Sequence, residues 1–233
     1  MFNPDFGSTR YGHSPTPVEG NKFRGLIDPS LNFNQRGYLN NRYIVWRHGQ
    51  SEANVAERIV SKIENGADQF GLTPVGFEQV RLSATQSRNM GIDNRSLLFS
   101  SPFLRCVQTA QEIASRIGAS GFTVVRDLRE RDFGIFEGAS SEAYKLIYDL
   151  DRAHPGHKLY GVESTHEVLL RIARLVNALE REHDQKTLVL VTHADVGEIL
   201  QATFSGLAPE RHRDLPKLKN AEAREVNLVG AYP

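Results

Sequence analysis

The 233-residue sequence has little cysteine and no long hydrophobic run. Cys106 is the only cysteine, so no disulfide can form within the chain, and we expect a reducing, cytoplasmic compartment. No apolar stretch approaches the roughly 20 residues that a membrane-spanning helix needs, so no membrane partner is expected. Residues 1–40 also lack a basic start followed by an apolar stretch, so we expect no secretory signal in them.

Net charge is absent too, because 28 basic residues balance 28 acidic ones. A neutral molecule has no overall field that would attract nucleic acid, so no nucleic-acid partner is expected. Any anionic ligand must therefore be held by a local cluster of charge. The basic residues comprise 21 arginines and only 7 lysines. Arginine presents a fork that fits phosphate or carboxylate oxygens in pairs, although a solvated surface would explain the same count.

The chain divides into two parts by composition. Residues 1–40 are rich in Asn, Gly, Pro and aromatic residues without apolar periodicity, and we interpret them as an irregular N-terminal arm. The arm could be loose, or it could lie against the body so that its basic groups reach a site. Residues 41–233 are interpreted as one domain, with β-prone apolar runs at Tyr43–Trp46, Leu97–Ser100, Phe122–Val125, Leu188–Thr192 and Val226–Val229.

Helical segments alternate with these runs and carry recognisable start signals. The pairs Thr73–Pro74 and Ser101–Pro102 are each expected to open a helix, ending at Gly91 and Gly118 respectively. Ser164 and Glu167 form a capping box before an amphipathic stretch, and a further helix is expected after Asp195. This alternation predicts an α/β fold, a three-layer α/β/α sandwich with a mostly parallel central sheet.

Polar residues gather where the predicted strands end. These are Arg47 and His48 after the first strand, Arg105 in the helix after the second, Glu130 after the third, and His193 after the fourth. In open α/β sheets, ligands bind beyond the carboxyl ends of the strands, so we expect these side chains to meet. Each alone has an ordinary structural interpretation; the set at successive strand ends favours a catalytic site.

Such a set suits phosphoryl chemistry. Two arginines can bind a phosphoryl group, and a neutral imidazole beside it can attack phosphorus. The imidazole needs a hydrogen bond at its other nitrogen, commonly from a backbone carbonyl, and Gly49 would permit a tight turn there. Glu130 is the best-placed acid for protonating the leaving group, ahead of Asp132, Glu137 and Asp195.

From about Arg42 onward the chain resembles the histidine phosphatase superfamily, the phosphoglycerate mutase-like proteins. The motifs that carry the resemblance are "RHGQSEAN", "GLTPVGFEQV", "SSPFLRCVQTA", "LRERDFGIFEG", "GVES" and "VTHADVG". The resemblance implies that His48 is transiently phosphorylated and that Glu130 acts as acid, then as base. It implies that Arg47, Asn54, Arg105, His193 and Ala194 contact the phosphoryl group. Ala194 stands where the family often has glycine. Neither a metal nor a cofactor is implied.

The branch of the family is judged from two departures. The stretch after Asn54 does not match the substrate-contacting stretch of glycolytic mutases, and the segment between Glu130 and Ser164 is short. A more open pocket would let water finish the reaction, which favours a phosphomonoesterase acting on a small phosphate ester. The alternatives are a phosphoglycerate mutase-type phosphotransferase and a non-catalytic phosphate-binding module. Specificity is expected from the arm and the loop Ser140–Glu163, and an exposed edge strand would allow a homodimer.

Other polar features have less specific interpretations. His154 and His157 could be surface residues, part of a specificity loop, or, least favoured, metal ligands. His166, His183 and His212 are expected to be solvated. The basic stretch "ERHRDLPKLKN" could edge the pocket, but a surface loop is the favoured interpretation.

Overall fold

The computed structural model describes residues 39–226. Residues 1–38, nearly all of the predicted arm, lie outside this range, so the arm and its boundary stay predictions. Within residues 39–226, no helix is both long enough and apolar enough to cross a bilayer.

A five-stranded sheet in the order β3-β2-β4-β1-β5 forms the centre of the domain. Its strands are β1 (Arg42–Arg47), β2 (Leu97–Ser100), β3 (Thr123–Val124), β4 (Thr187–Thr192) and β5 (Ala223–Val226). All neighbours run parallel except β5, which pairs antiparallel with β1. The mostly parallel sheet is therefore confirmed, with one antiparallel strand at its edge.

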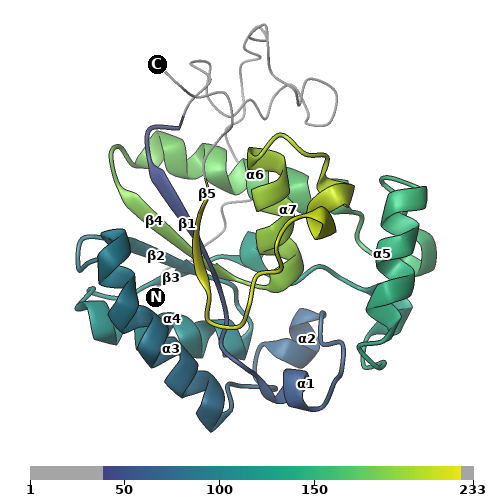
Figure 1. Cartoon of the computed structure of the whole chain (residues 1–233), viewed down its shortest axis with the longest axis horizontal. Coiled ribbons are helices and arrows are strands. Elements are labelled where there is room, and N and C mark those ends of the chain that lie inside the picture. The colour runs from purple at the N-terminus through teal and green to yellow at the C-terminus, as the bar shows by residue number, and fades with distance from the viewer. Residues whose placement is uncertain (1–38, 227–233) are drawn as a thin grey trace, which may run out of the picture.

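Helices cover both faces of the sheet (Figure 1). Helices α3 (Pro74–Gln86) and α4 (Leu104–Ile117) lie on one side, and α6 (Thr165–Glu182) and α7 (Ala194–Phe204) on the other. Side chains of β1 alternate between the layers: Ile44 and Trp46 join the core with α3 and α4, while Tyr43 and Val45 join the core with α6 and α7. The predicted three-layer sandwich is confirmed.

Shorter elements complete the domain. They are helices α1 (Glu52–Val55), α2 (Ile63–Gly66) and α5 (Ala143–Ala153), and 3₁₀ turns η2 (Ser87–Met90), η3 (Arg126–Leu128), η4 (Gly134–Phe136), η5 (Leu159–Gly161) and η6 (Pro209–Asp214). In Figure 1, α5 stands apart from the sheet, beyond α7.

Several element boundaries differ from expectation: α3 ends at Gln86 and continues to Gly91 only as the 3₁₀ turn η2, and β3 spans Thr123–Val124 where Phe122–Val125 was predicted. Helix α4 begins at Leu104, after the cap residue Phe103, and not at Ser101. The Ser101 hydroxyl accepts from the Phe103 amide (3.3 Å) and lies 2.8 Å from His193 Nε2. Strand β5 spans Ala223–Val226 where Val226–Val229 was predicted, and residues 227–229 lie outside the described range. The capping box before α6 is confirmed, since the Ser164 hydroxyl accepts the Glu167 amide hydrogen (3.2 Å).

Candidate active site

The strand ends converge on one pocket of about 400 Å³. Six predicted site residues line it: Arg47, His48, Asn54, Arg105, Glu130 and Ala194. His193 is fully buried beside it, with Nδ1 3.1 Å from Arg105 Nη2 and 3.6 Å from a Glu130 carboxyl oxygen. All seven residues are thus brought together by the fold, while their chemical roles stay predictions.

His48 is held as a neutral ring whose two nitrogens face Gly49 O and the Arg105 guanidinium. It continues β1 by donating its amide hydrogen to Thr192 O (3.0 Å). Its Nδ1 lies 2.7 Å from Gly49 O, so that nitrogen carries the proton and donates it. Burial, together with the positive charges of Arg105 and Arg47, lowers the pKa of His48 well below its usual value. The Nε2 lone pair therefore faces Arg105 Nε, 3.2 Å away.

A pair of glycines supports the turn after His48. A Cβ atom on Gly49 would lie 2.6 Å from Gly76 O on α3, and one on Gly76 would overlap Gln50 O. The close approach that Gly49 permits is thus to helix α3. The N-terminal turn of α3 can consequently pack directly against the backbone that carries the imidazole.

The two arginines keep guanidinium nitrogens free. Arg105 is 3% exposed, and its Nη2 donates to Val60 O (3.0 Å) as well as to His193. Arg47 donates from Nη1 to Leu218 O (2.8 Å). Arg105 Nη1 and Arg47 Nε are buried and have no partner within residues 39–226. Buried N–H groups without acceptors are costly, so these two favour an anionic ligand.

Glu130 has the surroundings of an acid that stays partly protonated near neutrality. One carboxyl oxygen accepts the Arg131 amide hydrogen (2.9 Å). Burial, followed by the negative charge of Asp195, raises the pKa of Glu130 to about 7. The same pocket that keeps His48 uncharged therefore also keeps about half of this carboxyl protonated at neutrality, which suits a general acid.

Two residues not assigned to the site from the sequence fix the His193 ring. The Ser101 hydroxyl lies 2.8 Å from His193 Nε2, and Cys106 Sγ lies 3.5 Å from the same nitrogen. Both residues are fully buried, and burial raises the pKa of the Cys106 thiol to about 12. Ser101 was missed because a serine before proline was interpreted as a helix start.

Asn54 and Ala194 reach the pocket from helix starts. The Asn54 side-chain oxygen accepts the Ser51 amide hydrogen (3.0 Å) and an Asn220 side-chain N–H (3.2 Å). The side-chain nitrogen of Asn54 has no partner among the residues described and is available as a donor. Ala194 is the first residue of α7, directly after His193.

The far wall of the pocket comes partly from Ser140–Glu163, the segment that was expected to be a specificity loop and that contains helix α5. It is built by Arg58, Ser141, Tyr144, Tyr148, Asp195, Arg213 and Lys217. The spacing of Tyr144 and Tyr148, one helical turn apart, was the available signal, and the two rings stack (centroids 5.7 Å apart). Asp195, the weaker acid candidate, accepts a hydrogen bond from the Tyr148 hydroxyl (2.9 Å).

Asp195 is kept charged by its neighbours. Burial alone would raise its pKa, but Arg213, followed by His212 and Arg131, outweighs that effect and lowers the pKa to about 2. The Arg213 guanidinium also lies over the Tyr148 ring (4.0 Å). A group this acidic is a poor proton donor, so Glu130 is the better acid.

Two expectations about the late basic segment were wrong. Arg213 and Lys217 line the pocket, so the segment does not form a plain surface loop. His212 is fully buried against Tyr148 because η6 packs on α5 and α7.

His157 is also buried, with Nε2 3.0 Å from Asp151. No group of three or more His, Cys, Asp or Glu side chains within residues 39–226 is arranged to hold a metal ion.

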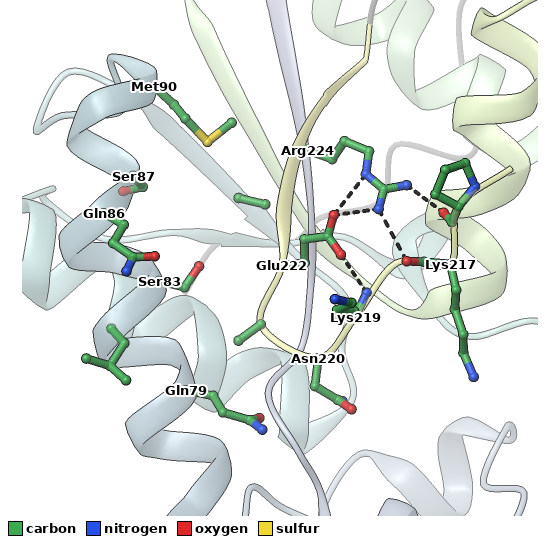
Figure 2. A pocket seen from close by; sticks show the side chains of 14 residues that line it. Gln79, Ser83, Gln86, Ser87, Met90, Lys217, Lys219, Asn220, Glu222 and Arg224 are labelled. Atoms are coloured by element: carbon green, nitrogen blue, oxygen red, sulfur yellow. Dashed lines mark hydrogen bonds and ion pairs between the residues drawn. The ribbon is translucent and has the colours of Figure 1, made fainter.

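Residues 216–224, which we call the strap, pass behind the end of β1. The Ala221 amide donates to His48 O (3.0 Å), and the Arg47 amide donates to Glu222 O (3.0 Å). Figure 2 shows the outer side of the strap, where Arg224 donates to the Glu222 carboxylate and to Lys217 O. A second pocket, of about 740 Å³, lies between this side of the strap and α3. The strap therefore lies between this outer pocket and the catalytic residues.

Comparison with known proteins identifies the family. The model of the histidine phosphatase superfamily (branch 1) matches residues 43–231. The agropine synthesis reductase of Rhizobium rhizogenes is 28% identical over 173 residues, which cover 72% of this chain but only 36% of the reductase. The metal-independent phosphoserine phosphatase of Arabidopsis thaliana is 26% identical over 196 residues, covering 79% of this chain and 75% of that protein.

A solved structure agrees with this match. Phosphoserine phosphatase from Entamoeba histolytica, in complex with 3-phosphoglyceric acid, is 25% identical with a TM-score of 0.63, over 79% of this chain and 89% of that chain. The family and the phosphatases among these relatives support a phosphoric monoester hydrolase as the class of enzyme. Because the family model matches more than half of its residues, the chain belongs to the histidine phosphatase superfamily.

Proposed function

We propose that the chain is a metal-independent phosphomonoesterase that hydrolyses a small phosphorylated metabolite through a phosphohistidine on His48. The observation that carries this proposal is the pair of buried, unpartnered guanidinium nitrogens, Arg105 Nη1 and Arg47 Nε, close to a neutral imidazole. A phosphoryl group would supply the acceptors that these N–H groups lack.

In the first step, His48 Nε2 attacks phosphorus and the ester P–O bond breaks. Glu130 gives its proton to the departing alkoxide, so that the product leaves as an alcohol. The proton on His48 Nδ1 stays hydrogen-bonded to Gly49 O, which holds the ring in position. Arg47, Arg105, Asn54 and His193 stabilise the charge on the phosphoryl oxygens.

In the second step, water releases the phosphate. The Glu130 carboxylate takes a proton from water as the water oxygen attacks phosphorus, and the P–N bond breaks. Inorganic phosphate departs, His48 is neutral again, and Glu130 is protonated for the next cycle. The cycle closes without a metal or other co-reactant.

We further propose that the substrate bears a second acidic group. Arg58 and Lys217 both line the pocket and are exposed, and neither side chain has a partner within residues 39–226. Two such cations suit a carboxylate or a second phosphate. Relatives named for phosphoserine, and one bound to 3-phosphoglyceric acid, support a carboxylate.

A phosphate-release screen tests this function. Phosphoserine and 3-phosphoglycerate should give higher kcat/KM values than glycerol phosphate, and Arg58→Ala with Lys217→Ala should remove that preference. Brief reaction with ³²P-labelled substrate should leave an acid-labile label on His48, and His48→Ala should abolish both label and turnover.

The rivals give different results in the same assay. A mutase-type phosphotransferase would require a bisphosphate and return a product that retains its phosphate. A binding module would bind phosphate or vanadate but release no phosphate from any ester. Label on a residue other than His48 would contradict the proposed intermediate.

A further inference from the structure

The backbone carbonyl of Leu218, a residue of the strap, accepts a hydrogen bond from the Arg47 side chain. Arg47 Nη1 donates to Leu218 O, which leaves the edge formed by Nε and Nη2 turned away from this contact. That edge is the one with which arginine binds two oxygens of an anion at once. The position of one carbonyl oxygen therefore decides where the free edge of Arg47 points.

The Leu218 backbone is itself held firmly. Its side chain is 1% exposed and packs so closely against α7 that a Cβ on Gly197 would lie 2.9 Å from Leu218 Cδ2. Its amide hydrogen is donated to a carboxylate oxygen of Glu198 (2.9 Å). The side chain, the N–H and the C=O of Leu218 thus each have a partner, and the partner of the N–H is the Glu198 carboxylate.

Glu198 is a buried carboxylate that the proposed mechanism does not use. It is 0% exposed, and its second oxygen accepts from Arg213 Nη1 (2.6 Å). Burial raises the pKa of Glu198, while the charge of Arg213 opposes that rise. Burying a carboxylate here costs desolvation free energy. Its two hydrogen-bond partners are the Leu218 amide and the Arg213 guanidinium.

We infer that Glu198 is a positioning residue: by binding the Leu218 amide it orients the Leu218 carbonyl, and thereby directs the free edge of Arg47 into the phosphoryl site. This inference rests on the proposed function only in taking Arg47 as a phosphoryl ligand. Glu198 itself does not line the pocket.

The test measures orthovanadate and inorganic phosphate binding by calorimetry, alongside KM and kcat for a small aryl phosphate. Glu198→Ala should weaken anion binding and lower kcat/KM about tenfold, the effect of losing one hydrogen-bonded contact. Glu198→Gln keeps an oxygen that can accept from Leu218 and should stay within about threefold of the wild type. Equal losses in both variants would make Arg213 the operative partner and overturn the inference.

A double-mutant cycle separates positioning from general loosening. If Glu198 acts through Arg47, Glu198→Ala should cause no further loss of anion binding in an Arg47→Ala background. Equal losses in both backgrounds would overturn the inference. Should Glu198→Ala fail to fold, the same cycle is run with Glu198→Gln, whose smaller loss should likewise vanish without Arg47.

The matched control is Glu180→Gln. Glu180 is a partly buried carboxylate at the opposite end of the sheet, where it binds Asn41 and Tyr43. This variant should leave anion affinity unchanged. Because binding is read without turnover, the inference is tested even if no ester is hydrolysed, so failure of the proposed function is seen separately.

Discussion

Burial in the catalytic pocket shifts the pKa values of two residues in opposite directions, and each shift suits a different role. Desolvation disfavours charge on both, so it lowers the pKa of His48 and raises the pKa of Glu130. The imidazole is therefore a base that is not protonated near neutrality, and the carboxyl, with a pKa of about 7, is an acid that is still about half protonated there. Both forms are required at the start of the proposed first step.

Replacing Glu130 by glutamine separates acid catalysis from binding. Glu130→Gln cannot protonate an alkoxide, so kcat/KM for alkyl phosphates should fall by about 10²- to 10⁴-fold. An aryl phosphate such as p-nitrophenyl phosphate leaves without protonation and should lose less than about tenfold in its first step. The kcat/KM values of both substrate classes, which report the steps through the first phosphoryl transfer only, check this; equal losses in kcat/KM would show that another group is the acid.

The pH profile should reflect the same carboxyl. The pKa of about 7 means that Glu130 is protonated below that pH and ionised above it, so kcat/KM for alkyl phosphates should decline as pH rises through 7. His48, whose pKa is lowered, should add no acid limb near 6.5. In Glu130→Gln the decline near pH 7 should vanish, and its persistence would assign it elsewhere.

At the scale of elements, helix α3 supports the turn that follows His48. Gly49 and Gly76 approach so closely that neither can carry a side chain without moving the helix or the turn. The helix is therefore part of the catalytic framework, although none of its side chains lines the pocket.

A methyl group at this contact should disturb both stability and activity. Gly76→Ala should lower the free energy of unfolding by about 1–3 kcal/mol, the usual cost of overpacking, and reduce kcat by displacing His48. Val75→Ala, at a neighbouring position that is 55% exposed, should change it by less than about 0.5 kcal/mol. Urea denaturation with matched kinetics checks both; a fully active Gly76→Ala would show that the turn does not depend on α3.

At the scale of the whole molecule, the layers could be predicted and part of the site could not. Apolar runs and capping signals predicted the sandwich, and the strand-end rule located His48, Arg105, Glu130 and His193. Strand β5 was misplaced because the two adjacent charged residues in "AREV" interrupt the apolar pattern. Arg213 reaches the pocket only through the packing of η6 on α5 and α7, a long-range contact without a local signature. The homodimer stays a prediction.

Buried histidines should make the fold sensitive to acid. His48, His193 and His212 all have lowered pKa values in the folded state, so the unfolded chain binds more protons. Their stabilisation is complete above about pH 6.5 and is lost as pH falls below it, by up to about 1.4 kcal/mol per pH unit for each proton. Glu130 opposes this with one proton, because its pKa is raised.

Urea midpoints between pH 7.5 and 5.5 measure this balance. The wild type should lose stability as the pH falls. His212→Asn should be less stable at pH 7.5, yet its stability should fall less steeply, because one titrating group is gone. Parallel curves for the two proteins would contradict the assignment.

The thiol of Cys106, which lies against His193, can report how often the catalytic centre opens. Cys106 is completely covered, and its raised pKa suppresses the reactive thiolate. An alkylating reagent can modify it only when α4 and the end of β4 separate. The labelling rate would therefore measure how often α4 and the end of β4 separate beside the phosphoryl-binding residues. Motions of peripheral loops would not contribute to it.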